Sequence, residues 1–569
     1  MNRMEDPSCW KWSCFIVESG MDAGSFFPLK ENSPEKKDDL CKNPVSFPED
    51  GILNLYSLKG VLPQPGKKIL LAGEFDAEQA SSCFIGMAGE GKFLLHFNSR
   101  IILDGRQWGN NEFPLQHNSH ILELDLLPGR NQLIYEVSAS GTSARFFLKI
   151  MENMQSLSFR YGPYLTFPDS SEKAISIVFS SNRPSPAAVD YCKEGETTFH
   201  RIYDNLGGQR RRDKAVHSIR LSELESGCVY RYRCVLQDDC RNLEELYTPE
   251  NTFRVPSEQE KEFSFVFTAD LQNVGGRSEY LQALLGKDPG AGADFFVFGG
   301  DLFWTSNFDR SVAEEFLEEY RSITNGTLPL VMVRGNHEIY GKESNRYFEY
   351  FTPPCEGREG YYMFRRGKVC FIVLDFCDDD GWMPPSSTRQ FHDFEPYLKA
   401  QRKWLEKAVK LPMCQEAEYR IVLAHGVPLG DPHKYMPTHV REGICGIFSG
   451  KDPQVRIHLW LGGHVHRPFR SIPGSNSCYS VMDPAEFSGA PHDPVGADYD
   501  FPVVITGGPN GKAGANMQNT SIHVEVTGKG LTVRSLDRNQ KEFDAFTVAP
   551  DGTVLDLNRD ETQFGFYRY

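Results

Sequence analysis

The apolar residues of this chain follow two patterns, one before about residue 262 and another after it. Between about residues 46 and 255, short segments such as 174–179 and 229–235 alternate apolar and polar residues between turns. This alternation predicts β-strands with one buried face. After residue 262 the strand-like segments become nearly continuous apolar runs, such as 295–298, and helical segments lie between them. Runs of this kind are typical of a sheet that is covered on both faces.

These patterns predict a multidomain chain with five parts. Residues 1–45 lack clear periodicity and are expected to form a loosely ordered lead-in, because they include a charged stretch at 30–39. Residues 46–152 have the rhythm of a jelly-roll-like β-sandwich, and residues 155–255 are predicted to form a second sandwich. Residues 262–545 are predicted to form an α/β domain, and residues 546–569 a C-terminal tail.

The second sandwich carries one more specific signal. Leu224 lies six residues before Tyr230, within a turn that contains glycine. This arrangement resembles the tyrosine corner of fibronectin type III sandwiches, which is a structural feature and not a catalytic one.

Composition narrows the classes of function and of location. The net charge is −16, which argues against nucleic acid as a partner. No apolar stretch approaches the roughly 20 residues that span a bilayer, and the N-terminal residues show no secretory pattern. Fourteen cysteines are few for 569 residues, which favours reduced, packed thiols and a cytoplasmic location. One disulfide among Cys228, Cys234 and Cys240 is still an alternative.

Five short segments in the second half carry the candidate chemistry, and each follows a strand-like run. They contain Asp270 with Gln272, Asp301, the segment Asn336-His337-Glu338, His425, and the pair His464 and His466. Open α/β sheets place their sites at the ends of strands, so these distant residues are expected to meet in one cleft. Carboxylate, amide and imidazole groups together form a ligand set for two adjacent divalent metal ions.

Those segments resemble the signatures of the calcineurin-like metallophosphoesterase superfamily, and in particular the purple acid phosphatase-like proteins. The resemblance covers residues 263 to about 545 and implies a four-layer α/β/β/α domain after the two sandwiches. It implies that Asp301 bridges two ions, that Asp270 and His466 bind the first, and that Asn336, His425 and His464 bind the second. It also implies that His337 is the catalytic acid and that Glu338 orients it.

The chain departs from the purple acid phosphatases at two positions. They carry a tyrosine ligand three residues after the aspartate that corresponds to Asp301, and this chain has Trp304, whose indole cannot bind a metal. Gln272 stands where many superfamily members have histidine, and it is either a weaker ligand or a hydrogen-bonding neighbour. A ferric–tyrosinate centre is therefore not expected. The expected cofactors are two divalent ions, Mn²⁺, Fe²⁺ or Zn²⁺.

The function predicted from these residues is hydrolysis of a phosphate ester by a metal-bound hydroxide, with a phosphomonoester favoured. There are two alternatives. One is a phosphodiesterase or nucleotide pyrophosphatase on the same centre, and the other is a catalytically degenerate protein that binds metal or carbohydrate. The expected partner is a small phosphorylated substrate that contacts Asn336 and Arg467, with neither nucleic acid nor membrane involved. The sequence leaves open the substrate itself, the oligomeric state and the role of the first sandwich.

Overall fold

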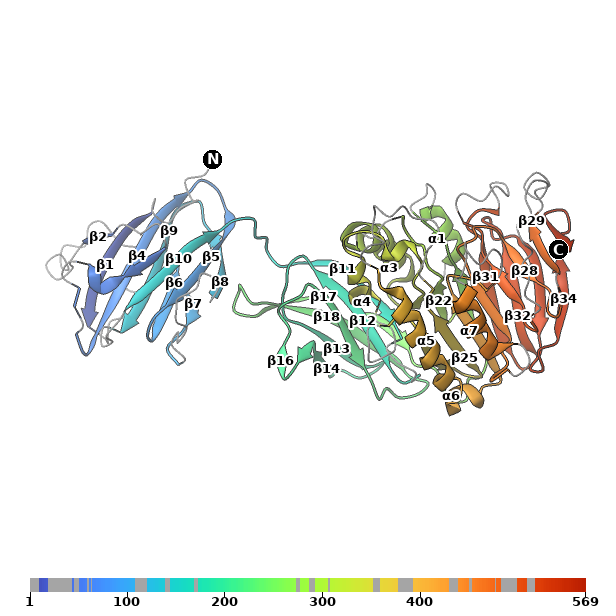
Figure 1. The fold of residues 1–569 in the computed structure, drawn as a ribbon. Helices are drawn as coiled ribbons and strands as arrows, with labels where there is room; N and C mark the ends of the chain where they lie inside the picture. Colours follow the sequence, from blue (N-terminus) through green and yellow to red (C-terminus); the bar gives the residue numbers. More distant parts are fainter. Residues whose placement is uncertain are drawn as a thin grey trace. The chain divides into compact units, whose positions relative to one another are not determined.

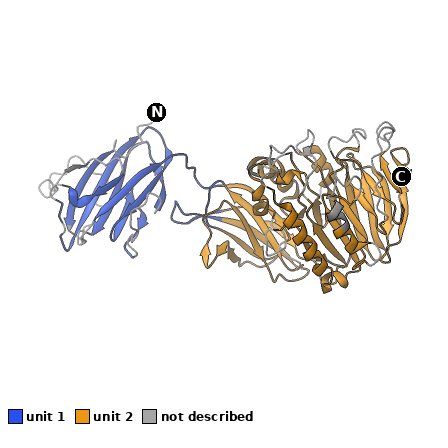
Figure 2. Ribbon diagram, viewed as in Figure 1, with its two compact units in different colours: residues 1–158, 182–186, 236–246 blue, residues 159–181, 187–235, 247–569 orange. Residues whose placement is uncertain are grey.

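The computed structural model divides the chain into two compact units (Figure 2), which comprise residues 1–158, 182–186 and 236–246, and residues 159–181, 187–235 and 247–569. The residues that it describes are 10–18, 43–45, 51–58, 61–62, 64–107, 120–138, 144–167, 172–272, 277–285, 292–304, 308–351, 359–376, 392–428, 438–449, 453–475, 477–481, 499–508 and 517–568. No helix among them is long and apolar enough to cross a membrane.

The first unit contains two antiparallel sheets with one shared hydrophobic core. The strand orders are β2-β1-β4-β9-β6-β7 and β3-β10-β5-β8. The strands are β1 (Lys11–Glu18), β2 (Asn43–Val45), β3 (Ile52–Asn54), β4 (Lys67–Ala77), β5 (Ser81–Gly89), β6 (Phe93–Phe97), β7 (Arg100–Asp104), β8 (His120–Leu126), β9 (Gly129–Ser138) and β10 (Arg145–Met151), and a 3₁₀ turn, η4, spans Leu55–Ser57. Tyr135 of the first sheet stacks on Phe146 of the second, with ring centroids 4.4 Å apart. Apolar side chains on the facing sides of the sheets thus hold this unit together.

Strand β1 corrects the expectation that residues 1–45 form a loosely ordered lead-in. All eight of its residues pair with β4, from Lys11 opposite Glu74 to Glu18 opposite Lys67. Trp12 and Cys14 pack in the core, and Ile16 packs against it. The segment is too short to be recognised alone, because its paired residues on β4 lie 49 to 63 positions later and that pairing makes it a strand.

The middle β region consists of β11 to β20. Its strands are β11 (Phe159–Thr166), β12 (Ile175–Ser181), β13 (Ala187–Lys193), β14 (His200–Tyr203), β15 (Asn205–Leu206), β16 (Gln209–Arg210), β17 (Val216–Leu221), β18 (Val229–Asp238), β19 (Glu244–Tyr247) and β20 (Asn251–Arg254). The hydroxyl of Tyr230 accepts a hydrogen bond from the backbone N–H of Glu225 at 2.9 Å, which is the contact that a tyrosine corner predicts. Cys228, Cys234 and Cys240 are free thiols. The predicted domain boundaries around this region stay predictions. Strand β11 pairs with β23, so one sheet contains strands from both sides of the predicted boundary.

The C-terminal part of the second unit contains a ten-stranded sheet in the order β17-β12-β11-β23-β22-β21-β31-β32-β33-β34. Its further strands are β21 (Phe263–Thr268), β22 (Phe295–Phe298), β23 (Pro329–Met332), β31 (Ser521–Thr527), β32 (Gly530–Leu536), β33 (Glu542–Val548) and β34 (Val554–Arg559). The helices near β21–β23 are α1 (Arg277–Leu285), the π-helix η5 (Phe308–Leu317), α3 (Glu318–Thr324), η6 (His337–Ile339), η7 (Ser344–Arg346) and α4 (Tyr347–Tyr350). Strands β21, β22 and β23 are parallel neighbours.

An eight-stranded sheet follows, in the order β24-β25-β26-β27-β30-β28-β29-β35. Its strands are β24 (Tyr362–Arg366), β25 (Val369–Leu374), β26 (Tyr419–Ala424), β27 (Leu459–Gly462), β28 (Phe469–Ser471), β29 (Ser477–Val481), β30 (Val503–Ile505) and β35 (Phe564–Arg568), and its helices are α5 (Phe394–Ala408), α6 (Pro412–Gln415) and α7 (Thr438–Phe448). Figure 1 shows α5 and α7 over this part of the chain. Strands β25, β26, β27 and β30 run parallel.

Three hydrophobic cores organise this α/β part. One contains side chains of both sheets, such as Phe265 and Phe371, whose rings meet edge to face at 5.3 Å. A second joins β21–β23 to α1, η5 and α3, and a third joins β25–β27 to α5 and α7. Packing of both sheets on both faces explains why their parallel strands are continuous apolar runs.

The predicted tail at 546–569 is wrong in the same way as the lead-in. Strand β35 pairs with β29 over five residues, and β34 pairs with β33. The sequence does not reveal β35 because its partner strand lies more than 80 residues earlier, and β34 is mostly exposed.

Buried histidines predict a loss of stability in acid. Burial lowers the pKa of His217, His458 and His523, and that of His523 falls to about 4. An unfolded chain protonates histidine near pH 6.5, so this stability is present above pH 6.5 and is lost as pH falls through about 4. We expect urea denaturation at pH 5 to show a loss from His523 on the order of 1–2 kcal/mol relative to pH 7.

The matched variant for this prediction is His523→Gln, which cannot be protonated. Its free energy of unfolding should depend less on pH between 7 and 5 than that of the unmodified chain. Identical pH dependence in both proteins would contradict this assignment.

Candidate metal centre

Every predicted ligand lies just after a parallel strand of the two C-terminal sheets. Asp270 and Gln272 follow β21, Asp301 follows β22 and Asn336 follows β23. His425 follows β26, and His464 and His466 follow β27. The carboxyl ends of parallel neighbours share one edge of a sheet, so this topology brings together residues far apart in the sequence.

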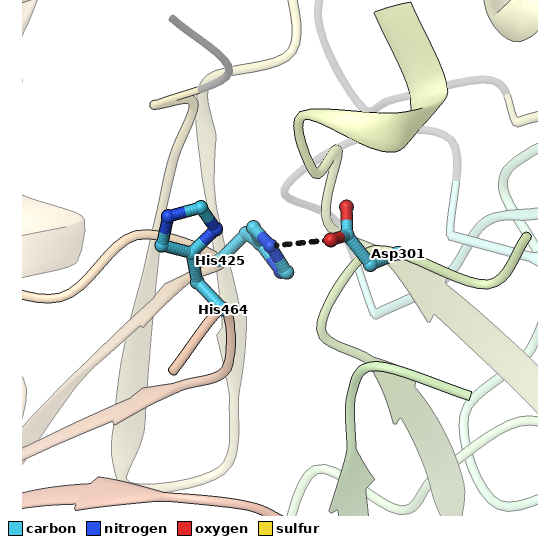
Figure 3. A group of neighbouring side chains, drawn as sticks. All are labelled: Asp301, His425 and His464. Atoms are coloured by element: carbon cyan, nitrogen blue, oxygen red, sulfur yellow. Dashed lines mark ion pairs between the residues drawn. The ribbon is translucent and has the colours of Figure 1, made fainter. Parts of the chain in front are cut away.

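The carboxylates and imidazoles converge on Asp301. The Nε2 atom of His425 lies 3.2 Å from Asp301 Oδ2 and 3.9 Å from Asp270 Oδ1, and His466 Nε2 lies 3.2 Å from Asp270 Oδ1. Two groups have ligand atoms within 4.8 Å of one another: Asp301 with His425 and His464, and Asp270 with Asp301 and His466. Figure 3 shows the first group, with the imidazole of His425 directed at the carboxylate of Asp301. Asp301 is the member that both groups share.

Asn336 joins the first of these groups. Its Oδ1 lies 2.9 Å from Nδ1 of His464, and its Nδ2 donates to the hydroxyl of Tyr340 at 3.3 Å. The bond to Tyr340 fixes the amide so that its oxygen faces the imidazole. Tyr340 was not predicted from the sequence, and its only signal is its place four residues after Asn336 in the short helix region η6.

The backbone at this edge is strained. Among the described residues, fourteen that are not glycine have positive φ, and five of these are predicted ligands: Asp270, Gln272, Asp301, His464 and His466. Left-handed backbone costs such a residue roughly 1–2 kcal/mol and persists where the surroundings enforce it. The concentration of this strain in the ligand set indicates a functional site.

Electrostatics within the cluster follow from burial and opposite charge. Burial alone would raise the pKa of Asp301, but His425, His337 and His464 outweigh it and hold that pKa well below its usual range. Burial alone would lower the pKa of His425, but the carboxylates of Asp301 and Asp270 raise it to about 10. The carboxylate of Asp270 likewise overcomes burial and raises the pKa of His466. Both carboxyl groups thus face cationic neighbours, which is the situation that a bound cation would also create.

Glu338 holds two loops of the site together, and its role in orienting His337 stays a prediction. Its carboxylate accepts hydrogen bonds from the backbone N–H groups of Asp301 at 2.8 Å, Leu302 at 2.9 Å and Gly335 at 2.6 Å. Burial, with the nearby charge of Asp301, raises its pKa to about 7. Glu338 therefore anchors the Asp301 loop to the Asn336 loop, and the sequence could not show this because the donors are backbone groups.

The imidazole of His337 is oriented by a backbone carbonyl. Its Nδ1 lies 2.8 Å from the carbonyl oxygen of Trp304, and its Nε2 lies 3.8 Å from Asp301 Oδ2. The backbone N–H of His337 also donates to Asp301 Oδ1 at 2.9 Å. Since the Trp304 carbonyl can only accept, Nδ1 carries a proton and Nε2 is the atom directed at the cluster.

The donor set fits divalent metal ions. Carboxylate oxygens, an amide oxygen and imidazole nitrogens suit Mn²⁺, Fe²⁺ or Zn²⁺. Gln272 adds independent support, because its side chain is fully buried and neither Nε2 nor Oε1 has a hydrogen-bond partner among the described residues. An orphaned buried amide costs about 1–3 kcal/mol, and a metal ion would satisfy its oxygen.

The remaining predicted contact stays a prediction. Arg467 directly follows His466 and is partly exposed. Two backbone groups that sequence reasoning missed are the carbonyls of Trp304 and Gly299, the second of which lies 2.8 Å from Nδ1 of His425. Backbone carbonyls have no sequence signature, although the Gly-Gly pair before Asp301 signals close backbone approach.

Close packing around Asp301 predicts that Gly335→Ala damages the site. A Cβ atom at this position would lie 2.3 Å from Asp301 Oδ1 and 2.6 Å from the backbone nitrogen of Asp301. Overpacking of this kind costs about 1–3 kcal/mol, so we expect a lower midpoint of thermal unfolding together with reduced metal binding. Gly446→Ala is the control, because a Cβ there meets nothing within 4 Å. Equal metal binding by both variants would contradict the packing argument.

Comparisons with known proteins agree with this site. Residues 263–468 match the family model described as calcineurin-like phosphoesterase, a segment that contains every predicted site residue from Asp270 to Arg467. No curated protein matches the chain significantly. The fold and the site therefore define a metallophosphoesterase, a hydrolase of phosphate esters. More particularly, the segment 263–468 resembles the calcineurin-like phosphoesterases.

Two solved structures are similar to parts of this chain. A purple acid phosphatase, PPD1, from yellow lupin (Lupinus luteus) seeds is 15% identical, with a TM-score of 0.47, covering 85% of this chain and 92% of that one. PhoD is 13% identical, with a TM-score of 0.46, covering 72% of this chain and 94% of that one.

Proposed function

We propose that this protein is a phosphomonoesterase that acts on a small phosphorylated substrate at a centre of two divalent metal ions. The observation that carries the proposal is the position of Asp301, whose carboxylate belongs to both groups of candidate ligands. Asp270, His466 and Gln272 would hold one ion with Asp301, and Asn336, His425 and His464 would hold the other. Such ions, when bound, supply a water molecule of lowered pKa as nucleophile and offset the charge on phosphoryl oxygens.

The chain's own residues prepare this chemistry. Backbone N–H groups of His337 and His464 hold the carboxylates of Asp301 and Asp270, so both carboxylates keep their places as ligands. The Gly299 carbonyl binds Nδ1 of His425 and leaves Nε2 for the ion. These contacts preorganise the ligand atoms before any ion binds.

His337 is the residue placed to protonate the leaving group. The Trp304 carbonyl keeps the proton on Nδ1, so the proton that His337 donates comes from Nε2. That Nε2 atom lies 3.8 Å from Oδ2 of Asp301, on the side of the candidate ligands. As the phosphorus–oxygen bond to the ester breaks, the ester oxygen takes this proton and leaves as an alcohol.

Charge supports an anionic phosphorylated substrate. Two divalent ions bring four positive charges, and the carboxylates that would bind them, Asp270 and Asp301, bring two negative ones. The third carboxyl group of the cluster, Glu338, accepts hydrogen bonds from backbone N–H groups, and its pKa is raised to about 7. The loaded site therefore keeps a net charge of about +1 with Glu338 ionised and about +2 with Glu338 protonated, which attracts a phosphoryl group.

A substrate panel tests this proposal. The full chain, loaded in turn with Mn²⁺, Zn²⁺ or Fe²⁺, is assayed with a phosphomonoester, a phosphodiester and a nucleotide pyrophosphate. We expect the highest kcat/KM for the monoester. A higher value for the diester or pyrophosphate would reassign the substrate class, and bound metal without any turnover would indicate a degenerate binding protein.

The finer architecture belongs to the same proposal. We take the strands β1 to β10 as a jelly-roll-like sandwich, which extends the predicted range 46–152 at its start. We take residues 155–255 as a fibronectin type III-like domain, and the predicted range 262–545, extended by β34 and β35, as a four-layer α/β/β/α domain. The helix-covered faces of the two C-terminal sheets and the core between them support the last of these.

Gln272→Leu tests whether the orphaned amide is a ligand. Leucine has a similar size and no unsatisfied polar atoms, so the metal-free variant should gain about 1–2 kcal/mol in free energy of unfolding. It should bind Mn²⁺ about 10-fold more weakly, as measured by calorimetry, because one oxygen ligand is lost. An unchanged affinity would show that Gln272 lies outside the coordination sphere.

A further inference from the structure

The side chain of Trp304 lies at the open side of the site. It is 42% exposed, which is unusual for tryptophan, while the candidate ligands Asp270, Gln272 and His425 are fully buried. Its indole meets the imidazole of His337 edge to face, with ring centroids 5.2 Å apart and an interplanar angle of 83°. The backbone of the same residue binds Nδ1 of His337 through its carbonyl.

Tyr340 meets the same imidazole and differs from Trp304 in exposure. Its ring lies 5.0 Å from that of His337, at 73°, but Tyr340 is only 7% exposed. The His337 imidazole thus has one aromatic neighbour that is buried and one that faces solvent. Only Trp304 of this pair is available to a ligand.

The exposure of Trp304 matters because of the side on which the leaving group departs. The inference rests on the proposed function, in which Nε2 of His337 protonates the ester oxygen of the leaving group. That oxygen must therefore approach Nε2, and the group attached to it extends from the same side. An exposed indole in contact with the His337 ring borders the path of that group.

We propose that Trp304 sets leaving-group specificity, and that the preferred substrates are monoesters whose leaving group carries a planar aromatic ring. An indole face offers a large apolar surface and a π-system on which an aryl group or a nucleobase stacks. Tryptophan cannot bind a metal, so its side chain is free of any ligand role at this position. A small alkyl leaving group gains little from such a surface.

The experiment compares three esters in the full-length, metal-loaded protein: phenyl phosphate, 2-naphthyl phosphate and glycerol phosphate. For Trp304→Ala, the ratios of kcat/KM for naphthyl over phenyl and for naphthyl over glycerol phosphate should fall by about 3-fold and about 10-fold. Trp304→Phe should keep most of both ratios. Phe566→Ala removes another exposed aromatic side chain, 57% exposed on the edge strand β35, and should change neither ratio.

Ratios that stay within about 2-fold in an active Trp304→Ala variant would overturn the inference. If that variant loses activity towards all three esters, calorimetry with naphthylphosphonate and methylphosphonate decides, because neither is hydrolysed. A lost preference for the naphthyl compound supports the role of Trp304, and a retained preference overturns it. If the unmodified protein hydrolyses none of the esters, the proposed function fails, while the same calorimetry still tests Trp304.

Discussion

Replacing Asp301 with asparagine is expected to lower kcat by at least about 10³-fold, which corresponds to about 4 kcal/mol of transition-state stabilisation. Asp301 is the member shared by both groups of candidate ligands, so its loss weakens both ion sites at once. Asparagine keeps the size of the side chain and an oxygen that can accept from the backbone N–H of His337. The fold should therefore survive, and the measurements are kcat with a phosphomonoester and metal content per chain.

Asp213→Asn is the matched control for this variant. Asp213 is an exposed carboxylate of the second unit, with a side chain 64% exposed, and its partner is Arg211. We expect kcat within about 2-fold of the unmodified protein, because loss of a surface ion pair costs at most about 1 kcal/mol of stability. Undiminished turnover by Asp301→Asn would remove the basis for a shared carboxylate.

Replacing His337 with alanine is expected to lower kcat by about 10²–10⁴-fold for glycerol phosphate. An alkoxide is a poor leaving group and needs the proton from Nε2. The loss should be much smaller for 4-nitrophenyl phosphate, because nitrophenolate leaves without a proton. The difference between the two esters separates acid catalysis from a general disturbance of the site.

The control for this prediction is His200→Ala, which removes an exposed histidine on β14. It should leave kcat unchanged for both esters. Equal losses for both esters in His337→Ala would show that His337 positions the substrate or the ligands and does not act as the acid.

The two predictions also separate His337 from Trp304. His337→Ala should affect substrates according to how much their leaving group needs a proton. Trp304→Ala should affect them according to the size of the aromatic ring. Phenyl and 2-naphthyl phosphate differ mainly in ring size, so the Trp304 effect is measured at nearly constant leaving-group chemistry.

The convergence of the candidate ligands could be predicted from the sequence because its cause is local. The continuous apolar runs before Asp270, Asp301, Asn336, His425 and His464 are strands β21, β22, β23, β26 and β27. Parallel strands of one sheet end at a common edge, so the residues after β21–β23 form one group and those after β26 and β27 form another. Packing of the two sheets on each other brings the two groups together. The order and types of those residues then indicate the metal chemistry.

What the sequence did not predict depends on distant or backbone partners. Strands β1 and β35 are short segments that become strands through pairing with β4 and β29. Glu338 connects two loops by accepting hydrogen bonds from their backbone N–H groups. Trp304 orients His337 through its backbone carbonyl. The left-handed backbone of Asp301 and His464 is also enforced by tertiary packing, since neither residue type requires it.

In the proposed centre, two cations share the carboxylate of Asp301. The most direct measurement is a crystal structure of the Mn²⁺-loaded protein, with anomalous diffraction at the manganese edge. We expect two peaks about 3.5–4 Å apart, one on each side of Asp301, with Asp270 and His466 at one and Asn336, His425 and His464 at the other. A single peak, or peaks away from Asp301 in a fully loaded crystal, would contradict the claim.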